Sequence, residues 1–542
     1  MTKSQEQFWA KKVAREAIEF AIKHNHEIVT VRSGASPSGP KHIGNMNDQV
    51  RGEFIRKSIE SYGSKARLVL TSDDMDPLRT IPMRLQENES KWIKTDENIL
   101  KILEPEVGKP VSKVVDPFGC HNSYAEHFTD LMMDGLRKIS VYPELYYVSK
   151  LYKEGKYDWF IAETIRKKDA VREVLKKYQQ NIPNDYIAFV PVCENCGKLT
   201  TKVTGVDLER MEVEYECTGR VLHGKYEIKG CGHRGKVSIR EGKLPWRLEW
   251  VADWKIFNTD AEPFGKEHFE GSWKSGKELA KRIYKFDPPV PLVYEFFLVD
   301  GEKMSSRLGN VYTIQDLLKI VEPEVVRYMY VKKPLVQRDI AVKEVYKLVD
   351  EFDEIERLAH EGRGERAEEA RNYYWYCVGE LKDKKPYRLP YRLAATIVQF
   401  YPPEVALERL TKSGIVPDNL SDEERQKTLT RLKLAKQWVE EFSDRKLRIA
   451  EANKEHYVKD EKTIQAFNYV YETYKSKEMN GEELQALFYE AARKFELNPS
   501  EFFKQGYLIF LGEEHGPRLG NFLASLDKEY VLKVMANIKL EK

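Results

Sequence analysis

The pattern of hydrophobic and polar positions near the start of the chain predicts alternating helices and strands. Hydrophobic residues recur at helical spacing from about residue 5 to 24, and the β-branched run "EIVTVRSG" that follows is typical of a strand. After a loop, "MNDQVRGEFIRKSIESYG" has the pattern of an amphipathic helix that ends near Gly63, and "ARLVLTSDD" predicts a second strand. This order predicts a βαβ unit in a parallel sheet, where ligands bind at the carboxyl ends of the strands.

The pattern changes twice further along the chain. From about residue 116 to 240, five of the six cysteines occur among many glycines and lysines, which indicates an insertion into the sheet domain. Apolar segments return at "KLPWRLEWVADWKIF" and at the predicted strand "PLVYEFFLV", and from about residue 341 one helical pattern follows another. We therefore predict a Rossmann-like α/β sheet domain with an insertion, followed by an all-α domain. The ranges are 1–115 and 241–300 for the two halves of the sheet domain, 116–240 for the insertion, 301–345 for a loop and connecting helices, and 346–542 for the helical domain.

Composition narrows the class of protein without identifying it. The 542 residues are 41% hydrophobic and 32% charged, as in a globular protein, and the net charge of +2 means that any nucleic-acid surface is local. No apolar run approaches the ~18 residues of a membrane span, and the start of the chain lacks the apolar core of a signal peptide. Six cysteines in so long a chain make no disulfide framework, so clustered ones are interpreted first as metal ligands. We expect a cytosolic protein.

The loop between the first strand and its helix carries the motif Gly39-x-x-His42-x-Gly44-Asn45. Glycines let the backbone approach a ligand closely, and a helix start offers free N–H groups that favour phosphate. A turn without any function is an equally good interpretation of this motif alone.

A second loop, "GEKMSSRLGN" at residues 301–310, also follows a predicted strand and precedes a helix. Lys303 offers a point charge for phosphate oxygens, and Ser305 and Ser306 offer hydroxyl donors. Taken alone, this segment is most simply a surface loop.

Together, in this order and in these contexts, the two motifs indicate one family. "PSGPKHIGN" resembles the HIGH signature, and "KMSSR" the KMSKS signature, of class I aminoacyl-tRNA synthetases. In that family an amino-acid carboxylate attacks the α-phosphate of ATP, which needs positioning and charge neutralisation more than acid–base groups. The resemblance implies catalytic roles for His42, Asn45, Lys303, Ser305 and Ser306, and ATP binding by Pro37, Gly39, His42, Gly44, Asn45 and Lys303.

Other segments resemble the class I lysyl-tRNA synthetases, an archaeal and partly bacterial family related to glutamyl-tRNA synthetases. They include "DDMDPLRTIP", "LPWRLEWVADW", "DAEPFGKEHF" and the tail "FLGEEHGPRLGNFLASLDKEYVLKV", so the likeness covers almost the whole chain. Family members usually read Lys-Met-Ser-Ser-Ser-Lys-Gly-Asn, whereas this chain has Arg307 and Leu308 at the fifth and sixth places. Either Arg307 supplies the second charge from a position displaced by one residue, or closure of this loop is weaker.

The resemblance also implies a lysine pocket, in which Trp246 and Tyr294 flank the aliphatic stem and can face the ammonium. A buried ammonium needs a carboxylate, and Asp73, Asp74 and Asp76 are candidates because they follow a strand. A glutamyl enzyme would instead need basic residues there. The competing interpretations are that these acids cap a turn and bind Arg79, and that Trp246 is ordinary core. The implied lysine-binding residues are Gly34, Ser36, Asp73, Trp246, His268 and Tyr294.

Two groups of residues have the composition of metal sites. "CENCG" and "GCGHRG" resemble zinc knuckles, and four thiolates would hold a structural Zn²⁺ with no open position. His233 is an alternative to one of the cysteines. In "DPFGCHNSYAEHF" the spacing is not diagnostic, and the alternative is a loop with a capping aspartate and surface histidines. The predicted ligands are Asp116, Cys120, His121 and His127 at one site, and Cys193, Cys196, Cys217 and Cys231 at the other.

The helical half is expected to read the anticodon, because single-stranded bases are bound by aromatic stacking and by Arg or Lys. The aromatic run from Tyr373 to Tyr376 is a candidate, although at helical spacing part of it must be core; "RQKTLTRLKLAKQ" is more simply a solvated face. The resulting hypothesis is a monomeric lysine–tRNA ligase that uses ATP and Mg²⁺, contains Zn²⁺ and acts on tRNA(Lys). The alternatives are a glutamyl-like class I synthetase and a non-catalytic, zinc-containing RNA-binding protein.

Overall fold

The computed structural model describes residues 8–223, 226–304, 311–442 and 450–541, and it contains the predicted βαβ unit. Strand β1 (Val29–Ala35) is followed by helix α3 (Asn47–Ser61) and strand β2 (Ala66–Ser72). The helix ends two residues before Gly63, whose φ of 83° suits glycine. β1 and β2 pair in parallel along their whole length, so their carboxyl ends lie at the same edge of the sheet.

Five strands form the main sheet, in the order β14-β13-β1-β2-β5, and every neighbouring pair is parallel. The second half of the sheet domain supplies β13 (Thr259–Gly265) and β14 (Val290–Tyr294), which confirms the Rossmann-like α/β fold. The edge strand β5 (Glu144–Tyr147) lies within the range 116–240 that the sequence assigned to the insertion. It is four residues long and none of them is fully buried, so it lacks the apolar run by which a central strand is recognised.

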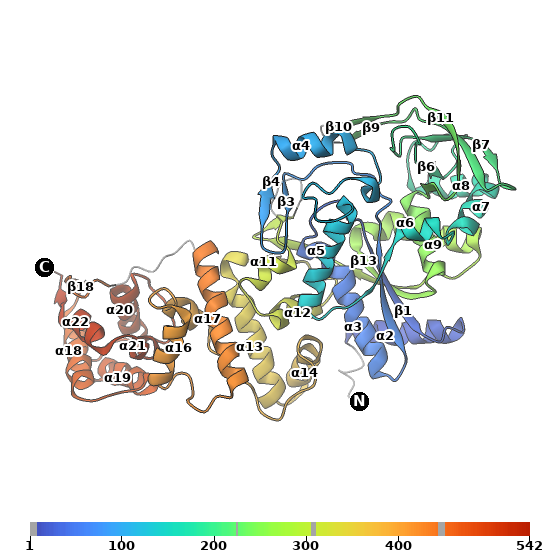
Figure 1. The fold of residues 1–542 in the computed structure, drawn as a ribbon. Coiled ribbons are helices and arrows are strands. Elements are labelled where there is room, and N and C mark those ends of the chain that lie inside the picture. The colour runs from blue at the N-terminus through green and yellow to red at the C-terminus, as the bar shows by residue number, and fades with distance from the viewer. Residues whose placement is uncertain (1–7, 224–225, 305–310, 443–449, 542) are drawn as a thin grey trace. The chain divides into compact units, whose positions relative to one another are not determined.

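Helices cover both faces of the sheet. Leu68 and Val69 are neighbours on β2 and therefore point to opposite faces. Leu68 lies against Gly52 of α3, whereas Val69 belongs to a core with Val251 of α9 (Trp246–Ile256). In Figure 1, α3 and α2 (Trp9–Lys23) lie beside β1. The loop before α3 and the start of α9 are thereby brought to the carboxyl edge of the sheet.

The inserted segment combines short helices with small antiparallel sheets. Its helices are α5 (Tyr124–Lys138), α6 (Val148–Lys153), α7 (Asp158–Arg166) and α8 (Lys168–Tyr178). Its antiparallel strands are β6 (Val190–Pro191) with β12 (Gly242–Lys243), β7 (Lys202–Asp207) with β8 (Glu212–Glu216) and β11 (Arg234–Ser238), and β9 (Arg220–His223) with β10 (Tyr226–Lys229). A hairpin of β3 (Arg84–Gln86) and β4 (Trp92–Lys94), followed by α4 (Glu97–Leu103), precedes it.

The chain forms two compact units, of which the first contains residues 1–317, 326–340 and 363–380. Besides the main sheet and the insertion, it includes β15 (Phe297–Val299), β16 (Glu302–Lys303), β17 (Arg338–Ile340), α11 (Ile314–Leu318) up to residue 317, and α14 (Glu365–Cys377). The assignment of α14 to this unit differs from the predicted helical range that begins at residue 346. Helix α12 (Pro323–Val331) is divided between the two units.

The second unit contains residues 318–325, 341–362 and 381–542 and is almost entirely helical. Arg431 is 2% exposed in it, and its guanidinium binds Glu322 Oε1 and Asp353 Oδ2, both at 2.6 Å. The basic run "RQKTLTRLKLAKQ" is therefore not purely a solvated face. The elements are α13 (Tyr346–Glu361), α15 (Tyr391–Ile397), α16 (Pro403–Lys412), α17 (Asp422–Phe442), α18 (Glu461–Ser476), α19 (Gly481–Lys494), α20 (Pro499–Leu511), α21 (Leu519–Ser525), α22 (Lys528–Ala536) and the paired strands β18 (His456–Val458) and β19 (Ile538–Leu540).

The aromatic run at 373–376 belongs to the first unit and is partly core. Tyr374 and Tyr376 are buried, and Tyr376 stacks on Phe8 with ring centres 5.0 Å apart. Two of the four rings are thus unavailable to stack on bases. Among the described residues, no helix combines the length and the apolar character that crossing a membrane requires.

Candidate active site

A cavity of about 350 Å³ lies at the carboxyl ends of β1 and β2. A 3₁₀ helix (Ile43–Met46) connects the loop after β1 to α3. Of the residues expected to bind ATP, the structure brings four together in the lining of this cavity, namely His42, Gly44, Asn45 and Lys303. The other two, Pro37 and Gly39, are not part of the described lining. Ser305 and Ser306, which were expected to be catalytic, and Arg307, the candidate second charge, lie outside the described residues.

The first loop holds the His42 ring in a buried position. The backbone N–H of His42 donates to Asn45 Oδ1 at 3.2 Å, so Asn45 fixes the start of the helix. A Cβ at position 44 would lie 3.0 Å from the His42 ring and 3.3 Å from Met304, which explains why glycine stands there. Burial, assisted by Lys41 and Lys303, lowers the pKa of His42 to about 4. The imidazole is therefore neutral near pH 7 and suited to donate a hydrogen bond to phosphate rather than to carry charge.

Lys303 lies on the short strand β16 at the mouth of the cavity. It is exposed, and its ammonium is 4.8 Å from the centre of the Phe296 ring. A positive charge on an exposed, flexible side chain can meet the phosphates of an incoming nucleotide.

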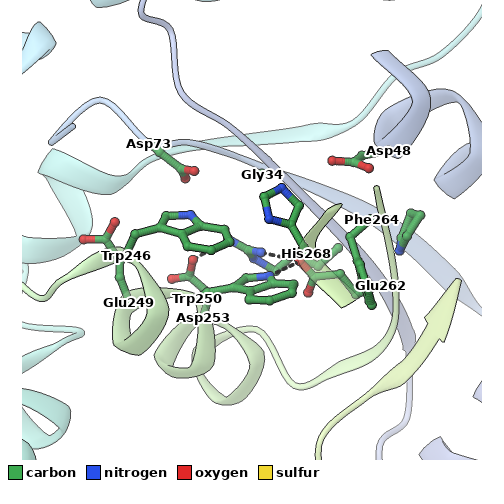
Figure 2. Close-up of a pocket in the computed structure, with 12 residues that line it drawn as sticks. Gly34, Asp48, Asp73, Trp246, Glu249, Trp250, Asp253, Glu262, Phe264 and His268 are labelled. Atoms are coloured by element: carbon green, nitrogen blue, oxygen red, sulfur yellow. Dashed lines mark hydrogen bonds and ion pairs between the residues drawn. The ribbon is translucent and has the colours of Figure 1, made fainter. Parts of the chain in front are cut away.

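A second, inner cavity of about 70 Å³ adjoins the first and shares with it Gly34, Asp48, Asp73, Trp246 and His268. In the view of Figure 2, Gly34 lies between Asp73 and Asp48. A Cβ on Gly34 would come within 3.1 Å of Thr71 Oγ1 and 3.4 Å of Asp73 Oδ2, so no larger side chain fits without movement. The inner cavity is lined by five carboxylates and one guanidinium, namely Asp48, Asp73, Glu249, Asp253, Glu262 and Arg32.

Arg32 is engaged by the protein itself. One terminal nitrogen donates to Glu262 Oε1 at 2.7 Å, and the other donates to Asp253 and to Thr71 Oγ1. Burial alone would lower the pKa of Arg32, but Asp253 and Glu262 outweigh it and raise that pKa. The single cation of the inner cavity is therefore neutralised and is a poor binder for a substrate carboxylate.

Two of the five carboxylates contact protein partners through both of their oxygens, although Glu249 Oε1 does so through an ion pair and accepts no hydrogen bond. Asp253 accepts hydrogen bonds from Tyr157 and Arg32 on its two oxygens. Glu249 accepts from the Tyr152 hydroxyl at 2.7 Å and pairs with Lys243 at 3.0 Å. These groups are structural parts of the cavity wall.

The other three carboxylates each keep an oxygen that accepts no hydrogen bond from the described residues. Glu262 Oε1 accepts from Trp250 Nε1 at 2.5 Å as well as from Arg32, while its buried Oε2 has no partner. Asp48 accepts from the Tyr294 hydroxyl at 2.5 Å, and Asp73 from Thr71 Oγ1 at 3.0 Å, each through Oδ1 only. Burial raises the pKa of both Asp73 and Glu262 to about 7. Near neutral pH, Asp73 and Glu262 are therefore each partly protonated.

The acids proposed from the sequence have different fates. Asp73 lines both cavities, whereas Asp74 accepts from the backbone and hydroxyl of Ser149 and caps the helix there. Asp76 is held by Lys243 at 2.6 Å, and the nearby Ser36 hydroxyl helps to lower the pKa of Asp76. Ser36, like Gly34, lines the outer cavity.

The aromatic residues proposed from the sequence do line the site. The rings of Trp246 and His268 lie 5.1 Å apart, and Trp246 stacks on Trp250 at the same distance with planes inclined by 16°. Tyr294 lines the outer cavity, but its hydroxyl is bonded to Asp48.

Sequence reasoning missed several site residues, namely Arg32, Lys41, Asp48, Glu249, Asp253 and Glu262. Glu249 and Asp253 are four apart on α9, and a repeat of acids at that spacing on an otherwise aromatic helix was an available signal. Glu262 sits within a fully buried strand, where a charged residue is rare unless it is paired.

Two groups of side chains in the first unit could hold a metal ion, and both match the predicted ligand sets. The ligand atoms of each group lie within 4.8 Å of one another. His233 is not one of them; its backbone carbonyl accepts from Cys217 N–H at 2.8 Å. In the other group, His127 Nε2 bonds Gln86 O at 2.8 Å, which fixes the tautomer and leaves Nδ1 directed at Cys120 Sγ at 3.3 Å.

Comparison with known proteins agrees with this geometry. A parallel sheet whose carboxyl edge brings His42 and Asn45 of one loop together with Lys303 of another is the arrangement expected of a class I aminoacyl-tRNA synthetase. The family model described as "tRNA synthetases class I (K)" matches residues 7–379, so the chain belongs to that family.

Similar proteins cover nearly the full length. The lysine–tRNA ligase of Haloarcula marismortui is 38% identical over 533 residues, which are 97% of this chain and 96% of that protein. The lysine–tRNA ligase of Methanocaldococcus jannaschii is 33% identical over 550 residues, with 97% and 98% covered. Among solved structures, a glutamate–tRNA ligase from Elizabethkingia meningosepticum is 12% identical with a TM-score of 0.37, covering 94% of this chain and 98% of its own.

Proposed function

We propose that the protein attaches L-lysine to the 3′ end of tRNA(Lys) through a lysyl-adenylate. The observation that carries this proposal is the inner cavity, where carboxylates with unpaired oxygens adjoin a loop-lined cavity suited to phosphates. An ammonium has three N–H donors, and Glu262 Oε2, Asp73 and Asp48 offer it three acceptors. The lysine–tRNA ligases to which the chain is similar support the same substrate.

The inner cavity would bind the lysine ammonium, and the outer cavity would bind ATP and be the place of reaction. His42, Asn45 and Lys303 would bind the ATP phosphates, and Mg²⁺, when bound with ATP, would neutralise further phosphate charge. The lysine carboxylate attacks the α-phosphate in line and pyrophosphate leaves, so no side chain has to transfer a proton. A neutral His42 fits that role, because it stabilises charge by hydrogen bonding.

The glutamyl alternative fits the inner cavity poorly. A substrate carboxylate would meet acids there, and both terminal nitrogens of Arg32 are already bound to Glu262, Asp253 and Thr71. Burying like charges without a free counter-ion is strongly unfavourable.

Amino-acid-dependent ATP–pyrophosphate exchange with tRNA present tests the proposed function. We expect exchange with lysine, and at least ~10³-fold less with glutamate, because buried polar groups left unpaired penalise the wrong substrate. Exchange driven by glutamate would establish the glutamyl alternative. The absence of exchange with any amino acid would favour a non-catalytic RNA-binding protein.

We further propose that both metal-ligand groups hold Zn²⁺. Tetrahedral Zn²⁺ with bonds of about 2.3 Å to sulfur places its ligand atoms about 3.8 Å apart. The measured Sγ–Sγ distances are 3.7 Å for Cys193–Cys231 and for Cys196–Cys217. With all four positions taken by protein side chains, each ion would be structural. Cysteines that bind metal rather than form disulfides are typical of a reducing compartment, so we also propose a cytosolic site of action, together with a monomeric state.

Metal analysis of purified variants tests the zinc proposal. We expect two zinc ions per chain, and about one in either Cys217→Ser or His127→Ala, together with a lower thermal midpoint, because metal binding stabilises the segment it links. Cys377→Ser is the matched control, since Cys377 is buried but lies in neither group. Zinc content that is zero in the wild type, or unchanged in both variants, would contradict the assignment.

A further inference from the structure

Lys41 is a half-buried cation that lines the outer cavity. It directly precedes His42 in the first loop. Among the described residues, its ammonium makes no hydrogen bond and has no carboxylate oxygen within ion-pair distance. Removing a charge from water without a partner is costly, so a site that keeps such a group usually supplies the partner as a ligand.

The charged groups around Lys41 attract it without neutralising it. Asp73 and Asp76 face it from the end of β2, but Asp76 is already paired with Lys243 at 2.6 Å, and Asp73 accepts from Thr71 at 3.0 Å. His42 and Lys303, the groups expected to bind phosphate, line the same cavity, and the charges of Lys41 and Lys303 both contribute to the lowered pKa of His42. Lys41 thus shares the outer cavity with Asp73, which also lines the inner cavity, and with the groups expected to hold ATP.

Under the proposed function, the reacting groups of the two substrates would meet in this cavity. If lysine extends its ammonium to Glu262, its carboxylate lies toward the outer cavity, and ATP on His42 and Lys303 brings its α-phosphate from the opposite side. The attacking carboxylate and the α-phosphate are both anionic, and their repulsion opposes the reaction. A cation placed between them would lower that barrier by electrostatic stabilisation.

We propose that Lys41 binds the oxyanion at this junction, the lysine carboxylate or the α-phosphate oxygens, and is a further catalytic residue. The inference rests on the proposed function. In the step it assists, a carboxylate oxygen forms a bond to the α-phosphorus and the bond from that phosphorus to the pyrophosphate oxygen breaks. No proton is transferred, so Lys41 has only to remain charged. The charge is provided by the first loop, and it is independent of whether Arg307 replaces the usual second lysine of the other loop.

Lys41→Met and Lys41→Arg test this role through pyrophosphate exchange and thermal unfolding. We expect Lys41→Met, which keeps length and removes charge, to lower the exchange rate by about 10²-fold at an unchanged thermal midpoint. Lys41→Arg should recover at least a tenth of the wild-type rate. Wild-type rates in Lys41→Met would overturn the inference, and so would equal losses in both variants.

The pH profile separates a charged role from a merely structural one. Burial outweighs the attraction of Asp73 and Asp76 and lowers the pKa of Lys41 to about 8, so the wild-type exchange rate should fall as pH rises through about 8. Arginine stays protonated, so Lys41→Arg should lose this alkaline limb even though the neighbouring Asp73, Asp76, His42 and Lys303 are unchanged. An identical alkaline limb in both proteins would contradict the proposal.

Calorimetric binding distinguishes the two sources of the oxyanion. If Lys41 binds the carboxylate, Lys41→Met weakens binding of lysine about tenfold but leaves binding of L-lysinamide, which has no carboxylate, unchanged. If it binds the α-phosphate, the variant weakens AMP and leaves adenosine unchanged. A variant that binds all four ligands like the wild type would overturn the proposal. A wild-type protein that binds and activates no lysine would instead refute the proposed function itself.

Discussion

Replacing Glu262 by glutamine is expected to raise the KM for lysine in pyrophosphate exchange by about 10² to 10³-fold, because removing one partner of a buried charge pair costs about 2–5 kcal/mol. Oε2 is a buried carboxylate oxygen of the inner cavity with no hydrogen-bond partner among the described residues, and it would accept from the substrate ammonium. The other such oxygen, Glu249 Oε1, is already paired with Lys243 at 3.0 Å. Glutamine keeps the shape of the side chain and one acceptor for Arg32 and Trp250, but it presents a neutral amide to the ammonium. The maximal rate should change much less, because the ammonium is remote from the reacting phosphorus.

Asp260→Asn is the matched control for this experiment. Asp260 is two residues away on the same buried strand, accepts from Thr30 N–H at 2.7 Å and contacts His26 at 2.8 Å, and lines neither cavity. It should lower thermal stability and leave the KM for lysine near the wild-type value. A normal KM in Glu262→Gln, or equal increases in both variants, would show that Glu262 does not bind the ammonium.

Replacing Lys303 or His42 by alanine should slow lysyl-adenylate formation by about 10² to 10³-fold each, the usual effect of removing one preorganised group from a developing charge. Both side chains line the outer cavity, His42 from the loop after β1 and Lys303 from β16. Single-turnover formation of lysyl-adenylate is the appropriate measurement, and the affinity for tRNA, measured separately, should not change. Because the pKa of His42 is lowered to about 4, its protonation should not affect the rate near pH 6–7. The wild type and His42→Ala should therefore have pH profiles of the same shape in that range.

An exposed lysine elsewhere gives the control for the second experiment. Lys274 pairs with Glu270 on the surface and lines neither cavity. Lys274→Ala should therefore form adenylate at the wild-type rate. Wild-type rates in both His42→Ala and Lys303→Ala would make the nucleotide assignment untenable.

The parts of the fold that the sequence predicted are those with a strong local pattern. β1, α3 and β2 each carry an unbroken apolar run or a helical period, and their order alone requires a parallel sheet. β5 was missed because its four residues carry no apolar run, and its place is decided by pairing with β2. The run at 373–376 was ambiguous for the converse reason: buried and stacking aromatics look alike until their neighbours, such as Phe8, are known.

The candidate site shows the same division. The two loops were predicted because each is a contiguous motif with its own chemistry. The acids of the inner cavity come from α3, α9, β13 and the end of β2, and only folding reveals that they surround one space. Asp73, Asp74 and Asp76 are equivalent as sequence, yet the structure gives one to the cavity, one to a helix cap and one to Lys243.

The ion pairs of Lys243 have a consequence for how this chain tells amines apart. This side chain is buried, and Asp76 and Glu249 hold its ammonium at 2.6 and 3.0 Å and raise its pKa. The protein thus carries a covalently attached copy of a lysine side chain beside the cavity proposed for the free amino acid, held by the same kind of acids. This tethered lysine occupies one set of carboxylates permanently, so the free amino acid is left with those at Glu262, Asp73 and Asp48. Because Lys243 already neutralises Asp76 and Glu249, a free lysine would not compete with it and would bind the remaining acids instead.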